Sequence, residues 1–384
     1  MKTFSKYVNQ LYRAAFLLGP ALLLLTGCER RDLYVYGDGF KSVQVAVDWR
    51  NYDRDQQLYP HTPDPDGMTV WFFPRDGRKS FKYTTAKVDT FETYLSRGQY
   101  DCLVFDYSPE EYGMQEFVDM DYASTTKVRS TPSSYQVDSI PELYGEACYA
   151  TALPKNQKGT TLLSNDPEKM AADTTAMDII SGEYDRYIPY EERDSYQETL
   201  TRQLFNVRPL LVPWNMRIRI YVKGIHYLRS VAGTVAGLAN GYMLLQGKTT
   251  DTPCLQREDD WEIHVTGDSV GYIAKTFKTW GPLDFSNSYD LNSKEPPADL
   301  SGRPASQIRV NLEMLLRDRR TKLYYHFDVG NLVKVYQNEY ALRIDLPDGF
   351  EGQPVLPYVD AYNGMEMDGV VIPWEDPINS DVIL

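Results

Sequence analysis

The sequence contains few of the residues from which metal and catalytic sites are most often built. Among 384 residues there are only four histidines and four cysteines. The histidines, His61, His226, His264 and His326, are scattered along the chain, and no two of them have the spacing of a metal-binding pair. The H-E-x-x-H zinc motif and the phosphate-binding P-loop are also absent. We therefore predict that the chain is not an enzyme and that it holds no metal ion and no cofactor.

Acidic residues do not gather in a way that changes this prediction. Glu110 and Glu111 are adjacent, as are Glu191 and Glu192, and neighbouring side chains point apart on a strand or a helix, so neither pair is suited to paired acid and base catalysis. The segment 64–67, Asp-Pro-Asp-Gly, lacks the evenly spaced acids and the terminal glutamate of a calcium-binding loop. We interpret it as a plain turn.

The chain also lacks an excess of positive charge. Its formal net charge is −14, with 54 acidic and 40 basic residues. Nucleic acid binding needs clustered lysine and arginine. This composition therefore argues against a nucleic acid partner.

The N-terminus contains an apolar run that is too short to span a bilayer. Residues 14–25 are apolar apart from Gly19 and Pro20 and follow three basic residues, whereas a membrane helix needs about twenty residues. This pattern predicts an export signal over residues 1–27. It ends in Leu-Thr-Gly before Cys28, which resembles the lipobox of bacterial lipoproteins, in which the cysteine thiol is acylated.

We therefore predict that Cys28 is a lipidation site and that acyl chains such as palmitate hold the protein in a membrane. Glu29 after the cysteine resembles lipoproteins that are passed on to the outer membrane. Residues 28–40 would form the lipidated tether between the membrane and the fold.

The other three cysteines are Cys102, Cys148 and Cys254. At most one pair of them can form a disulfide, and their spacings match no metal site. We expect them to be small buried hydrophobic residues.

What the sequence does have is alternation of apolar and polar residues over short segments, which is typical of strands with one buried face. Turn residues separate these segments, and a run of loops interrupts them. The predicted strands cover residues 42–49, 68–74, 98–107, 215–223, 271–280, 308–316, 321–329 and 340–346, with residues 81–83 pairing back onto 68–74. The pattern predicts an all-β chain of two domains, at residues 41–208 and 209–384.

Residues 122–200 differ from the rest, with few apolar runs and weak periodicity. We expect long loops, one or two edge strands and one short helix near residues 166–177, which begins at an Asp-Pro pair. Loops of this kind often have a function. An equally good interpretation is that they only cover the surface of the fold.

Gly233, Gly237 and Gly241 are spaced four residues apart. A membrane helix interface needs longer apolar flanks, and a phosphate loop should open a helix. We therefore predict a strand with glycines where the chain bends or packs closely, followed by a type I′ hairpin turn at Asn240 and Gly241.

Tyrosine is abundant, at 30 residues. Exposed rings could stack on sugars or lie in a protein interface, and some rings will be part of the core. The candidates are Tyr34, Tyr36, Tyr52 and Tyr59.

Several blocks of the sequence together resemble the lipoprotein members of the fimbrillin-like superfamily, which are anchor or accessory subunits of type V pili and their relatives. These blocks are CERRDL after the lipobox, PDGMTVWFFPRDG at residues 65–77, and RIRIYVKGIHYLRSVAGTVAGLANGY at residues 217–242. The resemblance implies two tandem transthyretin-like β-sandwich domains with long loops. It also implies a fimbrillin-like pilin partner, bound when a partner strand adds to an open sheet edge.

Shaft pilins of this superfamily have a processing arginine before the first core strand. Here Arg50 and Arg54 lie beyond a predicted strand, and Arg30 and Arg31 lie beside the lipid, which favours an anchor or accessory subunit. The predicted function is therefore that of a non-enzymatic outer-membrane lipoprotein in a fimbria-like assembly. The alternative is a surface glycan-binding lipoprotein of a polysaccharide-uptake system.

Overall fold

The computed structural model describes residues 40–50, 52, 65–133, 163–179, 203–286, 298–300 and 303–360, and nearly all regular structure in them is β-strand. The chain divides into two compact units. One contains residues 1–44, 92–98 and 178–203, and the other contains residues 45–91, 99–177 and 204–384. The boundary predicted at residues 208–209 stays a prediction. No helix among the described residues is long and apolar enough to cross a membrane.

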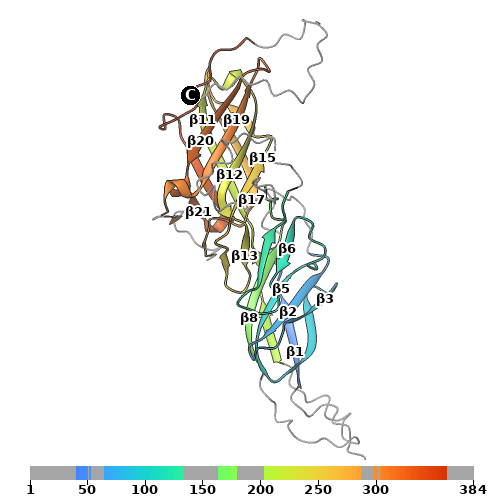
Figure 1. The fold of residues 1–384 in the computed structure, drawn as a ribbon. Coiled ribbons are helices and arrows are strands. Elements are labelled where there is room, and N and C mark those ends of the chain that lie inside the picture. The colour runs from blue at the N-terminus through green and yellow to red at the C-terminus, as the bar shows by residue number, and fades with distance from the viewer. Residues whose placement is uncertain are drawn as a thin grey trace, which may run out of the picture. The chain divides into compact units, whose positions relative to one another are not determined.

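The first half of the chain forms two sheets, and its predicted strands are confirmed. β1 (Phe40–Val47), β4 (Thr90–Ser96) and β9 (Gln203–Val207) form a sheet in the order β4-β1-β9. A second sheet has the order β10-β8-β5-β2-β3 (Figure 1). Its strands are β2 (Met68–Pro74), β3 (Phe81–Thr85), β5 (Gly98–Asp106), β8 (Ala171–Ile179) and β10 (Leu210–Leu211).

The helix predicted near residues 166–177 is wrong, because most of this segment belongs to strand β8. Ala171, Met177 and Ile179 are buried on one face, and two consecutive threonines favour extended backbone. β8 lies between β10 and β5. Most of the region in which we expected edge strands, residues 134–162 and 180–200, lies outside the described residues. An Asp-Pro start signal cannot outweigh this burial and pairing.

Strands of the second half form two further sheets. One has the order β16-β17-β11-β22-β21-β18 and the other β15-β12-β19-β20. The strands of the first are β11 (Trp214–Lys223), β16 (Glu262–Val265), β17 (Val270–Thr279), β18 (Ala298–Asp299), β21 (Lys334–Tyr336) and β22 (Ala341–Leu346). Those of the second are β12 (Leu228–Ala239), β15 (Pro253–Glu258), β19 (Arg309–Leu316) and β20 (Lys322–Asp328). Among the described residues of this half, four short 3-10 helices connect strands: η5 (Ile225–Tyr227), η6 (Ala305–Gln307), η7 (Gly330–Leu332) and η8 (Gln337–Glu339).

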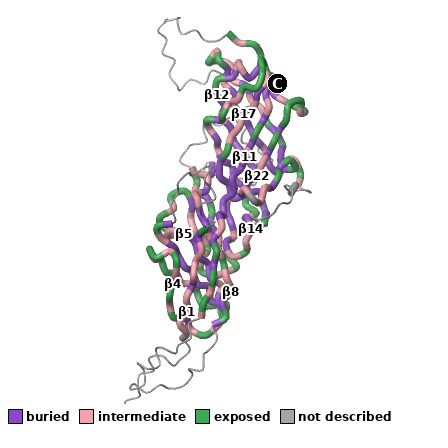
Figure 2. The backbone as a smooth tube through the Cα atoms, turned by 180° about the vertical axis from the view of Figure 1, so that it is seen from behind, coloured by how far each residue is buried: buried purple, intermediate pink, exposed green. Residues whose placement is uncertain are grey.

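The alternation predicted from the sequence produces the core of these two sheets. Met216, Ile218, Ile220 and Val222 of β11 are all at most 1% exposed. Figure 2 colours most of β11 as buried. They share one core with the inward residues of β19, β20 and β22. The hairpin of β19 and β20 is antiparallel as predicted, whereas the parallel pairing of β22 with β11 was not predicted.

The three glycines lie where the backbone has no room for a side chain. A Cβ on Gly233 would lie 2.5 Å from the carbonyl oxygen of Asn311, and one on Gly237 would lie 1.8 Å from that of Gln307. Gly237 also has a φ of +84° at a β-bulge, a conformation that favours glycine. The predicted close packing is therefore confirmed.

The hairpin turn predicted at Asn240 and Gly241 is wrong. β12 pairs with β15 and β19, whereas the next strand, β13 (Gly241–Met243), pairs with β14 (Lys248–Thr249) and β7 (Lys127–Ser130). The chain thus leaves one sheet at Asn240 and enters another. That sheet has the order β14-β13-β7-β6, with β6 at Gln115–Val118, and it joins strands from both halves of the sequence.

Candidate binding surfaces

Many of the sites predicted from the sequence lie outside the described residues. They include the predicted lipidation site. The full set is Cys28, Glu29, Arg30, Arg31, Tyr34, Tyr36, Arg54, Tyr59, His61, Asp64, Cys148, Glu191 and Glu192.

The two described cysteines, Cys102 and Cys254, are buried, as predicted, and both are free thiols. Burial raises the pKa of the Cys102 thiol, and it raises the pKa of the Cys254 thiol to about 12. Both thiols are therefore protonated at neutral pH and act as small core residues.

Tyr52 does not provide an exposed ring for sugar binding. It is 1% exposed, and the Lys169 ammonium lies 3.7 Å from its ring centroid. It belongs to a cluster around the buried carboxyl of Asp106, which accepts hydrogen bonds of 2.8 Å from the Tyr112 hydroxyl and 2.9 Å from the Ala171 N–H. Burial raises the pKa of Asp106 to about 6 against the opposing effect of these bonds. The cluster ties β5 to β8.

The polar residues considered for catalysis do not converge. Glu110 pairs with Lys82 at 2.5 Å, while the Glu111 carboxylate accepts the Ser108 N–H at 2.6 Å. The His264 imidazole lies 2.9 Å from the Glu262 carboxylate and stacks on Tyr272. No group of three potential ligands that could hold a metal ion occurs among the described residues.

One motif was missed in the sequence. Residues 267–271 read G-D-S-V-G, which matches the G-x-S-x-G pattern of a nucleophile elbow. That elbow lies between a strand and a helix, whereas this segment connects β16 to β17 in an antiparallel hairpin. The backbone carbonyl of Ser269 accepts the Gly224 N–H at 2.6 Å. The motif is therefore a structural turn.

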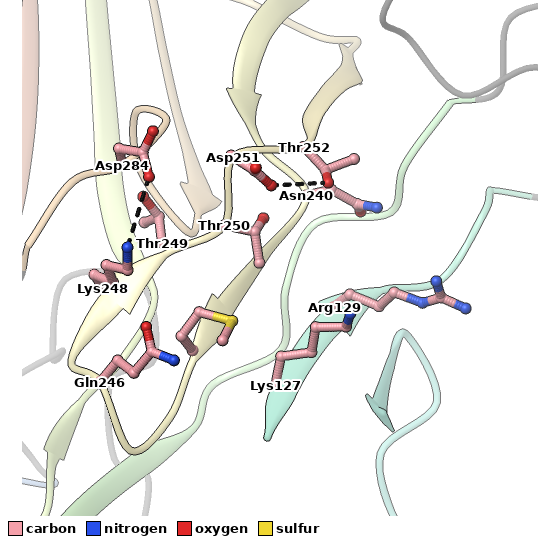
Figure 3. Close-up of a pocket in the computed structure, with 11 residues that line it drawn as sticks. Lys127, Arg129, Asn240, Gln246, Lys248, Thr249, Thr250, Asp251, Thr252 and Asp284 are labelled. Atoms are coloured by element: carbon pink, nitrogen blue, oxygen red, sulfur yellow. Dashed lines mark hydrogen bonds and ion pairs between the residues drawn. The ribbon is translucent and has the colours of Figure 1, made fainter. Parts of the chain in front are cut away.

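A polar pocket of about 250 Å³ lies beside β7, β13 and β14. Figure 3 shows its lining, in which Lys248 pairs with Asp284 at 3.9 Å. Lys127 and Arg129 also line it, and each has a carboxylate partner, Asp119 at 3.0 Å and Glu116 at 2.6 Å. The lining contains no aromatic ring. It therefore offers neither unpaired cations for an anion nor a stacking surface for a sugar.

Two carboxyl groups, those of Glu258 and Asp166, are buried together near the sheet β14-β13-β7-β6, which we call the junction sheet. Burial, together with the neighbouring Asp166 carboxyl, raises the pKa of Glu258 to about 9, although the Lys275 ammonium at 3.7 Å opposes the shift. Burial also raises the pKa of Asp166, which accepts a hydrogen bond of 2.8 Å from the Gln256 amide. Glu258 is therefore protonated at neutral pH, and the protonated carboxyl can share its proton with Asp166.

A larger groove, of about 780 Å³, runs beside β20. One wall is residues 324–328 of β20, and the other is formed by the end of β22 and the segment after it, to Val355. Phe350 packs edge-on against Phe327, with ring centroids 5.7 Å apart. Tyr325 and Phe327 lie parallel, at 6.4 Å. The groove thus combines an aromatic floor with the edge of a sheet.

The family described as "Domain of unknown function (DUF5119)" matches residues 27–257, which is more than half of the chain. The chain belongs to this family. A curated relative from Bacteroides ovatus, "Putative fimbrium anchoring subunit Fim4B", is 24% identical over 241 residues, or 62% of this chain. The chain covers only 57% of that relative's length. The relationship to fimbrillin-like proteins predicted from the sequence is confirmed.

Among solved structures, the chain is similar to one described as a "putative adhesin from Bacteroides ovatus". The TM-score is 0.50 at 16% identity, covering 87% of this chain and 98% of the other. This likeness concerns the fold alone. The fimbrial anchor protein Mfa2 from Porphyromonas gingivalis has a TM-score of 0.36 at 13% identity, covering 71% of this chain and 77% of that protein, which is too weak a likeness to carry an argument.

Proposed function

We propose that this protein is a non-enzymatic lipoprotein of the outer membrane that serves as an anchor or accessory subunit of a fimbria-like surface assembly. Acyl chains on Cys28 hold it in the membrane, and two tandem transthyretin-like β-sandwich domains follow the tether. A fimbrillin-like subunit binds by adding a β-strand to an open sheet edge.

The observation that carries this proposal is the 24% identity, over 241 residues, to a relative named as a fimbrium anchoring subunit. The lipobox residues before Cys28 support the membrane anchor. The all-β fold supports strand addition, because each open sheet offers edges at which main-chain hydrogen bonds can form. The glycan-binding alternative loses one of its candidate rings, since Tyr52 is buried.

Membrane fractionation with metabolic labelling by a radioactive fatty acid tests the anchor. The wild-type chain should be labelled and recovered in the outer membrane, whereas Cys28→Ala should be unlabelled and soluble. Cys102→Ala is the matched control and should behave as the wild type does, because this thiol is buried within the fold. A Cys28→Ala chain that stays labelled in the membrane would contradict the proposal.

Co-purification tests the fimbrial role. The detergent-solubilised wild-type chain, isolated from the bacterium that produces it, should bring down a fimbrillin-like subunit. If a polysaccharide-uptake protein co-purifies in its place, the glycan-binding alternative is correct.

A further inference from the structure

We propose that β20 is the strand acceptor of this protein, and that it binds an extended segment of a partner subunit with apolar residues at alternate positions and basic residues at its ends. This inference deepens the function proposed above and rests on it. The groove beside β20 provides both features that strand addition needs, a sheet edge and pockets for alternate side chains.

The hydrogen-bond pattern shows which backbone groups of β20 face the edge. Val329 N–H donates to the Ile308 carbonyl at 2.8 Å, and Leu316 N–H donates to the Thr321 carbonyl at 2.9 Å. In an antiparallel pair, bonded and non-bonded residues alternate. The backbone groups of Lys322, His326 and Asp328 therefore point away from β19. Among the described residues, no strand pairs with that side of β20.

Several other sheet edges in the described part of the chain are shorter, bridged or flanked by charges. β15 accepts the Ser164 N–H at 2.8 Å, and β14 is bridged to Phe285 at 2.9 Å. β3 is flanked by the ion pair of Lys82 with Glu110. Natural proteins block edges in these ways. β20 has seven residues and an adjoining groove.

The groove suits the side chains of an added strand. It follows five residues of β20, or about 17 Å of strand at roughly 3.4 Å per residue. Alternate side chains of a partner would reach the rings of Phe327 and Phe350 and the apolar side chain of Val355, which is 59% exposed. Burial of these surfaces would add to the main-chain hydrogen bonds.

The charge of the groove determines which charge the residues at the ends of the partner segment should carry. Its lining contains Asp328, Asp345 and Glu351 but no lysine or arginine. Asp328 and Asp345 each pair with an arginine, at 2.8 Å, which leaves Glu351 as the exposed charge that selects a basic partner. This charge disfavours the chain's own residues 361–384, which contain five acidic and no basic residues.

A peptide-binding experiment with the full chain tests the assignment. The probe has about eight residues, alternates valine with threonine and has lysine at both ends; a matched probe has glutamate at its ends. We expect the lysine probe to bind, and His326→Pro to weaken it by at least about tenfold. Proline blocks the outward N–H without removing a bond to β19, so the sheet is retained.

Val265→Pro is the control. Val265 lies in the edge strand β16 and is 60% exposed. Its N–H also points away from the neighbouring strand, because the hydrogen-bonded pair next to it is Thr266 with Val270. Val265→Pro should leave binding unchanged. Glu351→Lys should make the glutamate probe the better ligand. Equal binding by wild type and His326→Pro would overturn the assignment.

Truncation after Asp360 tests the competing occupant. Binding of the lysine probe that appears only in the truncated chain would show that residues 361–384 occupy the groove, which would overturn the proposal. If a fimbrillin-like subunit co-purifies equally with wild type and His326→Pro, the acceptor is wrong but the proposed function stands. If the wild type brings down none, the function itself fails.

Discussion

The junction sheet β14-β13-β7-β6 and the edge of β20 differ in whether their backbone hydrogen-bonding groups are paired. At the junction, strands of only two to four residues are closed by further bonds, including Ser130 N–H to the Asn240 carbonyl at 2.9 Å and Trp280 Nε1 to the Ser130 hydroxyl at 3.0 Å. β20 is longer and has a buried inner face, yet one side remains open. In the proposed account, the junction serves stability and the β20 edge serves binding.

The largest expected effect on stability comes from Gly241 at the junction. A Cβ there would lie 2.3 Å from the Val128 carbonyl oxygen, so Gly241→Ala should separate β13 from β7 and lower the free energy of unfolding by about 3 kcal/mol. Gly267→Ala is the control, because no atom lies within 4 Å of its Cβ position. Denaturant unfolding measures both variants, and equal stability would contradict the junction account.

A smaller loss is expected from Ser130→Ala. It leaves the buried Trp280 N–H without its acceptor, which should lower the free energy of unfolding by about 1–2 kcal/mol. The double variant with Trp280→Phe should lose less than the sum of the two single changes, because both remove the same hydrogen bond. Additive losses in thermal or denaturant unfolding would show that this bond does not stabilise the junction.

Glu258→Gln should stabilise the junction region in a pH-dependent way. The folded-state pKa of about 9 is above the ordinary value of 4.5. The stability that Glu258 contributes is therefore present below pH 4.5 and is lost as pH rises towards 9. The variant should be more stable than wild type by at least about 1 kcal/mol at pH 8 and similar to it at pH 4. Unfolding curves across this range measure the difference, and parallel pH profiles would contradict it.

The smallest effect on stability is expected at the open edge. His326→Pro should change the free energy of unfolding by less than about 1 kcal/mol, because no bond to β19 is lost. A loss as large as that of Gly241→Ala would show that the outward side of β20 is already paired within the chain, and the comparison of the two regions would no longer hold.

The sequence predicted features that depend on local periodicity. Met216, Ile218, Ile220 and Val222 alternate with polar residues, and this alternation fixes both the strand and its buried face. The close packing at Gly233 and Gly237 could also be predicted, but not the carbonyl groups that they contact, since Asn311 and Gln307 are far along the chain.

Features that depend on distant pairing could not be predicted. The pairing of β13 with β7 joins Gly241 and Arg129, and no local pattern near Asn240 distinguishes it from a hairpin. The groove beside β20 has the same origin, because its second wall contains loop residues such as Phe350 and Val355. Strand β8 was mistaken for a helix because only its neighbours β10 and β5 reveal its burial.

Hydrogen exchange of the backbone amides of β20 tests the central claim most directly. It would be measured on the full chain alone and in complex with the fimbrillin-like subunit that we expect to co-purify with it. The account predicts that the amides of His326 and Asp328, which face the edge, become protected in the complex, while those of Ile263 and Val265 in β16 do not. Protection confined to another edge, or none in β20, would contradict it.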